Sequence, residues 1–297
     1  MNWLIFALMA PLFWGVTNVI DKFLMDKILR KAYFLPIWIG IFGLPTFAFV
    51  FLFFKPVFVY PYSIIAVSLG FVYTLSYLVY AKILVNEEVS RAISLTFLYP
   101  ILVTIMAGIF LKEVFGFQRY VGIFLLVISG LLISYKKVGK KISVIKSLKL
   151  IILLILIWSS IQVIEKFVVG EIGNWSIYFW INVGLFLSIL PLFLIKSITK
   201  EFVGSLKKIG RRGLSTLAIA QCVSVCSSVS YYIAISLGPV SMVSAIGSLQ
   251  PFFVLIYSVL LTIFVPKFLK EDLSRYNLLM KFVAVLFVLV GGWLLLG

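Results

Sequence analysis

The chain has few residues that could do chemistry, and their types and spacing match no catalytic pattern. Among its 297 residues there is no histidine, and the ten acidic residues all lie near the ends of apolar segments. The missing histidine removes the commonest general base and the commonest metal ligand. Cys222 and Cys226 stand one helical turn apart, and a metal site needs more ligands than these two. We therefore expect no enzyme active site, no metal and no cofactor.

Two acid–lysine pairs are the strongest candidates for a coupling or gating role. They are Asp21-Lys22 and Glu165-Lys166, at matching places near the ends of two apolar segments. An ionisable group at bilayer depth costs at least about 2.5 kcal/mol, so one found there is a functional candidate. The alternative is ordinary interfacial charge whose lysines reach to the membrane surface.

Uncharged polar residues form the best candidate for a binding surface. Gln221, Ser224, Ser228 and Tyr231 are spaced by three and four residues, so a helix would place them on one face. Such a face either lines a wet cavity or packs against a small-residue neighbour. Three further amides favour the cavity: Asn18, Gln162 and Gln250.

Other residues could complete such a site or shape the helices around it. Lys82 could hold a carboxylate or phosphate by a charge-assisted hydrogen bond, or it could reach to the surface instead. Prolines inside apolar segments remove a hydrogen bond and kink the helix, which we expect at Pro100 and Pro251. The remaining candidates are aromatic residues that could stack on a ligand or simply pack: Trp14, Tyr77, Tyr80, Tyr99 and Trp158.

The elements that position these residues are membrane helices. Hydrophobic residues make up 63% of the chain and charged ones 12%, far from the roughly 25% charged of a soluble domain. A spanning helix needs about 20 mostly apolar residues. The sequence therefore predicts an all-α integral membrane protein of ten transmembrane helices, at 2–21, 33–54, 62–85, 92–111, 117–135, 149–167, 175–195, 213–236, 241–264 and 278–296.

Basic residues predict how these helices are oriented in the cell membrane. Ten spans put both termini on one side, and only four of the 26 Lys and Arg residues fall on that side. Connections rich in Lys and Arg stay in the cytoplasm, so we expect both termini outside. The net charge of +16 is then a topology signal, and we expect no nucleic-acid partner.

The chain also repeats itself. The segment Trp14–Phe23 and the segment Trp158–Phe167 share Trp, amide, acid, Lys and Phe at a constant offset of 144 residues. Val89-Ser90 is echoed by Val240-Ser241, and Leu111-Lys112-Glu113 by Leu269-Lys270-Glu271. Since each repeat holds five spans, 1–140 and 147–297 are predicted as inverted halves, an arrangement common in secondary transporters.

These motifs, together with Ala234–Ser241, Pro251 and a last span closed by glycine, resemble the EamA family of the drug/metabolite transporter superfamily. The resemblance implies a ten-helix carrier with a central cavity lined by spans 1, 3, 4, 6, 8 and 9. The chain departs from the family in its predicted orientation, because relatives usually keep both termini in the cytoplasm. It also has Trp14 and Asn18 where small multidrug pumps carry a glutamate in span one.

The sequence thus predicts a secondary transporter of a small polar metabolite, and the resemblance favours an amino acid or a related compound. A passive, channel-like facilitator and a carrier of phosphorylated metabolites are the alternatives. An intramembrane enzyme is disfavoured because its chemistry would need clustered His, Asp or Glu. The partners we expect are the small-molecule substrate and the lipid bilayer, with the protein working as a monomer.

Overall fold

The computed structural model describes residues 2–27, 33–86, 96–134, 147–264 and 275–296. All regular structure within these ranges is helical. The helices are α1 (Asn2–Lys27), α2 (Phe34–Phe54), α3 (Tyr62–Asn86), α5 (Tyr99–Phe110), α6 (Phe117–Ser134), α7 (Leu148–Ile172), α8 (Asn174–Phe193), α9 (Lys196–Leu237), α10 (Val240–Gly247), α11 (Gln250–Phe264) and α12 (Arg275–Leu296).

The composition and length of these helices are those of an integral membrane protein. In the described residues, six helices are long and apolar enough to cross a membrane: Trp3–Ile20, Phe34–Phe54, Tyr62–Ile83, Leu148–Ile172, Asn174–Phe193 and Gly213–Leu237. Shorter apolar helices cover Tyr99–Phe110, Phe117–Leu132, Val240–Val254 and Val283–Leu295. Many large apolar side chains face outward, Phe53, Phe117 and Trp293 among them. An apolar outer surface of this extent suits contact with lipid rather than water.

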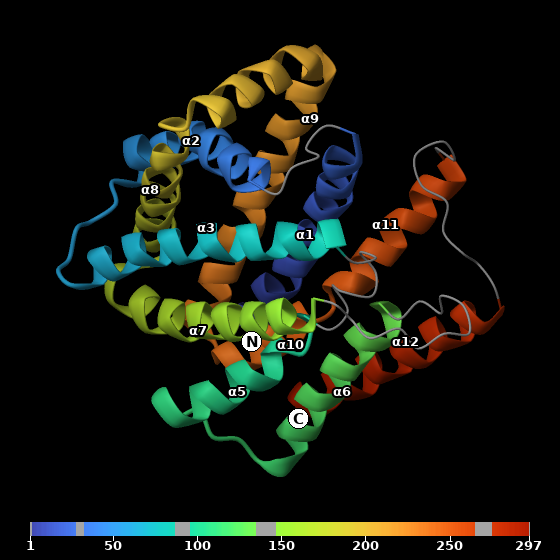
Figure 1. The fold of residues 1–297 in the computed structure, drawn as a ribbon. Helices are drawn as coiled ribbons and strands as arrows, with labels where there is room; N and C mark the ends of the chain where they lie inside the picture. Colours follow the sequence, from blue (N-terminus) through green and yellow to red (C-terminus); the bar gives the residue numbers. More distant parts are fainter. Residues whose placement is uncertain (1, 28–32, 87–95, 135–146, 265–274, 297) are drawn as a thin grey trace.

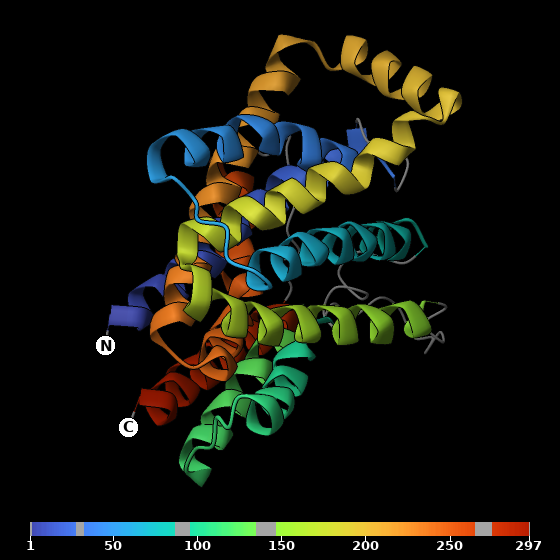
Figure 2. The same ribbon diagram turned by 90° about the vertical axis from the view of Figure 1, so that its left-hand side faces the viewer.

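Helices from the two ends of the sequence pack against each other rather than forming separate bodies. The helix pairs in the most extensive contact are α1 with α9, α6 with α12, and α3 with α8 (Figure 1). Glycines allow two of these approaches: a Cβ at Gly184 would lie 2.0 Å from Val67 O on α3, and one at Gly122 would lie 2.8 Å from Gly291 O on α12. Figure 2 shows both termini at the same end of the bundle.

The long connection before the eighth predicted span is itself helical. It forms the first part of α9, and Gly210, with φ of 64°, separates it from the spanning part. Its Phe202 is buried against Phe34 and Trp38 of α2, with ring centroids 6.4 Å and 5.2 Å away. This contact with α2 explains why the segment folds onto the bundle.

The two prolines expected to kink spans four and nine lie instead at the beginnings of helices. The ninth predicted span breaks at Ser248-Leu249, and Pro251 is the second residue of α11. In span four a turn at 97–98 precedes α5, where Pro100 occupies the first turn. A first-turn residue has no intrahelical N–H bond to lose, so proline fits there without a kink.

Candidate binding cavity

A cavity of about 280 Å³ lies among helices α1, α2, α3, α5, α7, α8, α9 and α11. On α2 its lining begins at Leu35, the second residue of that helix, and ends at Phe42. On α1 it comprises residues 14–18, and on α3 it extends from Tyr73 to Tyr80. Because α1 and α3 run away from the end that holds the termini and α2 runs back, the cavity occupies the half of the bundle remote from the termini.

Every residue predicted to bind the substrate, Lys82 excepted, lines this cavity. Whether these residues bind a solute stays a prediction, but the structure brings them together from six helices and from both halves of the chain. They are Trp14, Asn18, Tyr77, Tyr80, Tyr99, Trp158, Gln162, Gln221, Ser224, Ser228, Tyr231 and Gln250.

Lys82 is placed elsewhere. The positions of α3 that face the cavity are Tyr73, Tyr77 and Tyr80, spaced by four and three residues. Two residues further along a helix is a rotation of roughly 200°, so Lys82 projects from the opposite face, where it is exposed. It therefore supplies no positive charge to the cavity.

The sequence reading missed several lining residues. Tyr73 shares the helical spacing of Tyr77 and Tyr80, and that periodicity could have revealed it. Tyr178 and Asn182 are one turn apart on α8 and also line the cavity, yet the other polar residues of α8 lie near its ends and most of the helix is apolar. In such a helix the pattern is too weak to distinguish a face toward lipid from a face toward a cavity.

The cavity wall combines aromatic rings with uncharged polar groups. The ring of Trp158 lies 6.0 Å from that of Tyr80 and 6.1 Å from that of Tyr99. The ring centroid of Trp14, on α1, lies 5.6 Å from that of Tyr231, on α9. No Lys, Arg, Asp or Glu occurs among the described residues that line it. The site is therefore built for stacking and neutral hydrogen bonding rather than for ion pairing.

The amides of the cavity differ in how they are held. Gln162 Oε1 accepts a 2.7 Å hydrogen bond from Ser244 Oγ, so this side chain is oriented by α10. Asn182 Nδ2 donates to Tyr178 O at 2.8 Å. Asn18, Gln221 and Gln250 make no hydrogen bond within the described part of the chain, which leaves their amides available to a ligand.

Glu165 lies buried beside the cavity, at its end nearer the termini. The side chain is fully buried, and Oε1 accepts hydrogen bonds of 2.9 Å from both Tyr73 and Tyr232. We expected an acid near the end of a span and at the mouth of a cavity. The helix instead continues to Ile172, seven residues further on, and α3 and α9 close around the carboxyl group.

Beyond Glu165, two charged side chains hold the junction between α9 and α10. Lys166 Nζ donates to Ile235 O at 2.5 Å and to Gly238 O at 2.9 Å, at the carboxyl end of α9. Glu113 accepts from the N–H groups of Val240 and Ser241, at the amino end of α10. A cation is favourable at the carboxyl end of a helix and an anion at the amino end. These contacts therefore stabilise the packing of this end of the bundle.

The other predicted pair, Asp21-Lys22, lies in α1, but its side chains fall outside the described residues. A gate built from this pair remains a prediction.

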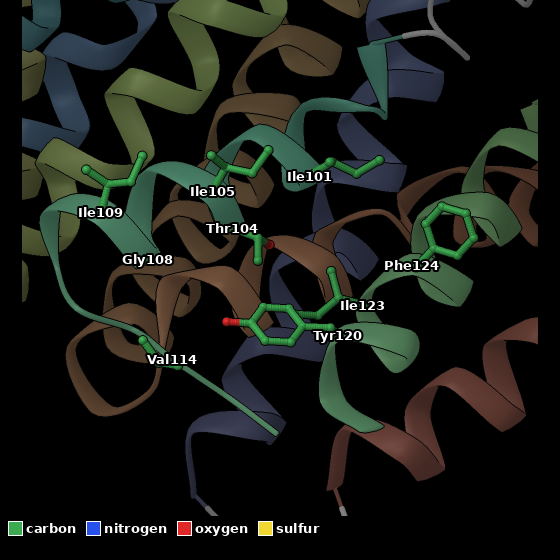
Figure 3. A pocket seen from close by; sticks show the side chains of 9 residues that line it. All are labelled: Ile101, Thr104, Ile105, Gly108, Ile109, Val114, Tyr120, Ile123 and Phe124. Atoms are coloured by element: carbon green, nitrogen blue, oxygen red, sulfur yellow. The ribbon is translucent and has the colours of Figure 1, made fainter. Parts of the chain in front are cut away.

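A second cavity, of about 450 Å³, lies between α5 and α6 (Figure 3). Apolar side chains line nearly all of it, including Ile105, Ile109 and Phe124, which are also exposed on the outer surface. Its polar side chains are Thr104 and Tyr120. It therefore suits contact with hydrocarbon rather than with a polar solute.

Comparisons with known proteins give one family match and one similar fold. Residues 1–135 match the model of the EamA-like transporter family. A solved structure described only as "Crystal structure of protein" is similar to this chain at a TM-score of 0.73 and 12% sequence identity, covering 99% of this chain and 96% of that one. At this identity the likeness concerns the fold alone. No curated protein matches the chain.

Proposed function

Because residues 1–135 match the EamA-like transporter family, we propose that the protein is a secondary transporter that carries a small polar metabolite across the cytoplasmic membrane by alternating access. The observation that carries this proposal is the central cavity. Its wall is uncharged, rich in aromatic rings and amides, and contributed by both halves of the chain. Such a wall can bind a solute by stacking and by neutral hydrogen bonds.

We further propose ten transmembrane helices in two inverted repeats, residues 1–140 and 147–297. The turns at 97–98 and at Ser248-Leu249 support this, because they fall at the same offset of 151 residues that relates the sequence motifs. Trp14 and Trp158, matched at offset 144, both line the cavity. Repeat-related helices with matching breaks around one cavity are typical of inverted-repeat transporters.

With the orientation that the positive-inside rule predicts, this structure is the inward-facing state. If both termini lie outside, the cavity occupies the cytoplasmic half and the packed end is the outer one. At that end the Lys166 and Glu113 contacts are joined by Trp3, which lies so close to Gly238 that a Cβ there would be 2.7 Å from the indole. A packed end opposite the cavity favours a carrier over a continuous pore.

The cavity also favours one class of solute. A phosphorylated metabolite would need Arg or Lys for charge-assisted binding, and the described lining has neither. At about 280 Å³ the cavity is at the small end of the range for ligand sites, roughly 300–1,000 Å³. We therefore favour a small solute without net charge that has an apolar or aromatic part, with amino acids as the leading class.

Counterflow in proteoliposomes tests the proposal. Purified protein is reconstituted, the vesicles are loaded with single amino acids, and uptake of the same radiolabelled amino acid is followed. Exchange that saturates and is lost in Asn18→Ala/Gln221→Ala supports the carrier, with Gln118→Ala as the control, since Gln118 is an exposed amide outside the cavity. Uptake without counterflow, at rates well above those of carriers, would indicate the channel-like facilitator. No exchange over amino acids and related neutral metabolites would overturn the proposed function.

A further inference from the structure

We propose that Glu165 is a proton-binding site, and that the outer end of the bundle closes only when this carboxyl group holds a proton. The proposal rests on the alternating-access function above and deepens it by naming the proton as the coupling ion. Three features of the site carry it: the burial of Glu165, the absence of a counter-ion among the described side chains, and a hydroxyl route to the cavity.

The first feature is a buried carboxyl group that is only half satisfied. Glu165 is fully buried, and both tyrosine hydroxyls donate to the same oxygen, Oε1. Oε2 is buried as well and has no hydrogen-bond partner among the described residues. An oxygen that accepts no hydrogen bond is the natural position for the acid's own proton, and the hydroxyl of Tyr231, which faces this carboxyl group, can accept a hydrogen bond from it.

The second feature is that no cation faces Glu165 among the residues whose side chains the structure describes. The titratable groups facing it there are hydroxyls: that of Tyr73 on α3, and those of Tyr231 and Tyr232 on α9. Of the other helices packed on α7, α5 and α8 supply only tyrosines, while α10 has no titratable side chain.

Neither of the two lysines nearest to Glu165 acts as its counter-ion. Lys166, on the same helix, is turned to the carbonyls of Ile235 and Gly238. Lys82, on α3, is exposed. An ionised carboxylate without a cation is costly at bilayer depth, so the closed arrangement requires the neutral acid.

The third feature is a route for the proton. Tyr73 and Tyr232 line the cavity and also donate to Glu165. When the outer end is open, outside water reaches the carboxylate, which takes up a proton there before the end closes. In the closed state a half-turn of the carboxyl group brings this proton to a tyrosine hydroxyl, which takes it and passes its own proton to cavity water, so the hydroxyl ends unchanged and the acid becomes ionised. The ionised acid favours reopening of the outer end, and one proton is moved from the outer side to the cavity side in each conformational cycle.

Cysteine labelling tests the site without knowledge of the solute. Val169, on α7 near its outer end, is almost fully buried, so Val169→Cys in a Cys222→Ser/Cys226→Ser background reports opening of that end. The probe is a membrane-impermeant maleimide applied to proteoliposomes. Labelling should rise with pH more steeply than in the same variant carrying Glu165→Gln, by up to about tenfold per pH unit, the limit for one linked proton. Glu171→Gln serves as the matched acid control, because Glu171 is an exposed acid on the same helix, and it should keep the steep profile.

A second variant guards against loss of fold in Glu165→Gln. Tyr73→Phe/Tyr232→Phe keeps the acid but removes two donors that favour its ionised form, so the labelling midpoint should move to higher pH. Identical profiles in the wild type, Glu165→Gln and this double variant would overturn the proposal.

A transport experiment separates this proposal from the function on which it rests. Vesicles containing the pH-sensitive dye pyranine are given a gradient of whichever amino acid shows counterflow. Proton movement that accompanies net solute uptake and is lost in Glu165→Gln supports coupling. Solute uptake with no proton signal in the wild type would overturn coupling and leave the carrier intact. If no solute is exchanged at all, the proposed function fails, and the maleimide profiles alone then decide whether Glu165 binds a proton.

Discussion

The hydroxyl of Ser241 donates a 2.6 Å hydrogen bond to Glu113 Oε2, which joins the amino end of α10 to the loop after α5. The same carboxylate accepts the N–H groups of Val240 at 2.8 Å and Ser241 at 3.1 Å. A helix leaves its first N–H groups without intrahelical partners, and a carboxylate there satisfies them and complements the helix dipole. A loop acid from the first half of the chain therefore fixes where α10, in the second half, begins.

Glu113→Ala should destabilise the protein by about 1–3 kcal/mol, because two backbone donors and one hydroxyl lose their acceptor. The loss should appear as a lower thermal unfolding midpoint in detergent, measured by intrinsic fluorescence. Glu171→Ala is the matched control, since Glu171 is an exposed acid near the end of α7. Equal midpoints for the two variants would show that the Glu113 contacts contribute nothing to stability.

Asn18→Ala should reduce transport while leaving expression and thermal stability unchanged. Its amide lines the cavity and has no partner in the described chain, so its removal costs the fold little. One hydrogen bond to a ligand is worth about 1 kcal/mol, a roughly fivefold loss in kcat/KM for counterflow.

Gln162→Ala should combine a transport defect with a modest loss of stability. Gln162 lines the same cavity but also accepts from Ser244, so the variant leaves a buried hydroxyl without its side-chain acceptor. Thermal unfolding of the two alanine variants, measured side by side with their uptake, checks this split. Unaltered uptake in both would mean that the cavity amides do not bind the solute.

Gly184→Ala should disrupt the cavity by separating α3 from α8. The new methyl group would lie 2.0 Å from Val67 O, a backbone atom that cannot move alone, and overpacking of this kind costs about 1–3 kcal/mol. Gly170→Ala is the control because open space surrounds that position, and alanine there should stabilise the helix by up to about 1 kcal/mol. Thermal midpoints that move in opposite directions are the expected result, and a Gly184→Ala midpoint at or above that of the wild type would contradict the close packing of α3 and α8.

A protease-sensitive tag at either terminus should be cut in intact cells, because the positive-inside rule places both termini outside. The structure puts the two termini at the same end of the bundle (Figure 2), so the two tags should behave alike. Tags protected until the membrane is permeabilised would reverse the orientation and make this structure the outward-facing state.

The sequence by itself determined those features that depend on local composition or on helical periodicity. The apolar runs predicted the helices closely, Phe34–Phe54 and Asn174–Phe193 among them, because transfer of a segment into lipid depends on its own composition. The spacing of Gln221, Ser224 and Ser228 predicted a shared face, because helical periodicity is a property of the segment alone.

Only the tertiary structure decided which apolar surfaces face protein and which face lipid. In a helix that is apolar on almost all sides, such as α2, both environments accept the same side chains, so the sequence carries no signal to separate them. The burial of Glu165 depends on Tyr73 and Tyr232, 92 and 67 residues away in the chain. The docking of Phe202 onto α2 and the capping of α10 by Glu113 likewise arise from contacts between distant segments. Such contacts form only when the packing of all the helices brings the partners together, and for that reason the closed end of the bundle was beyond the reach of the sequence.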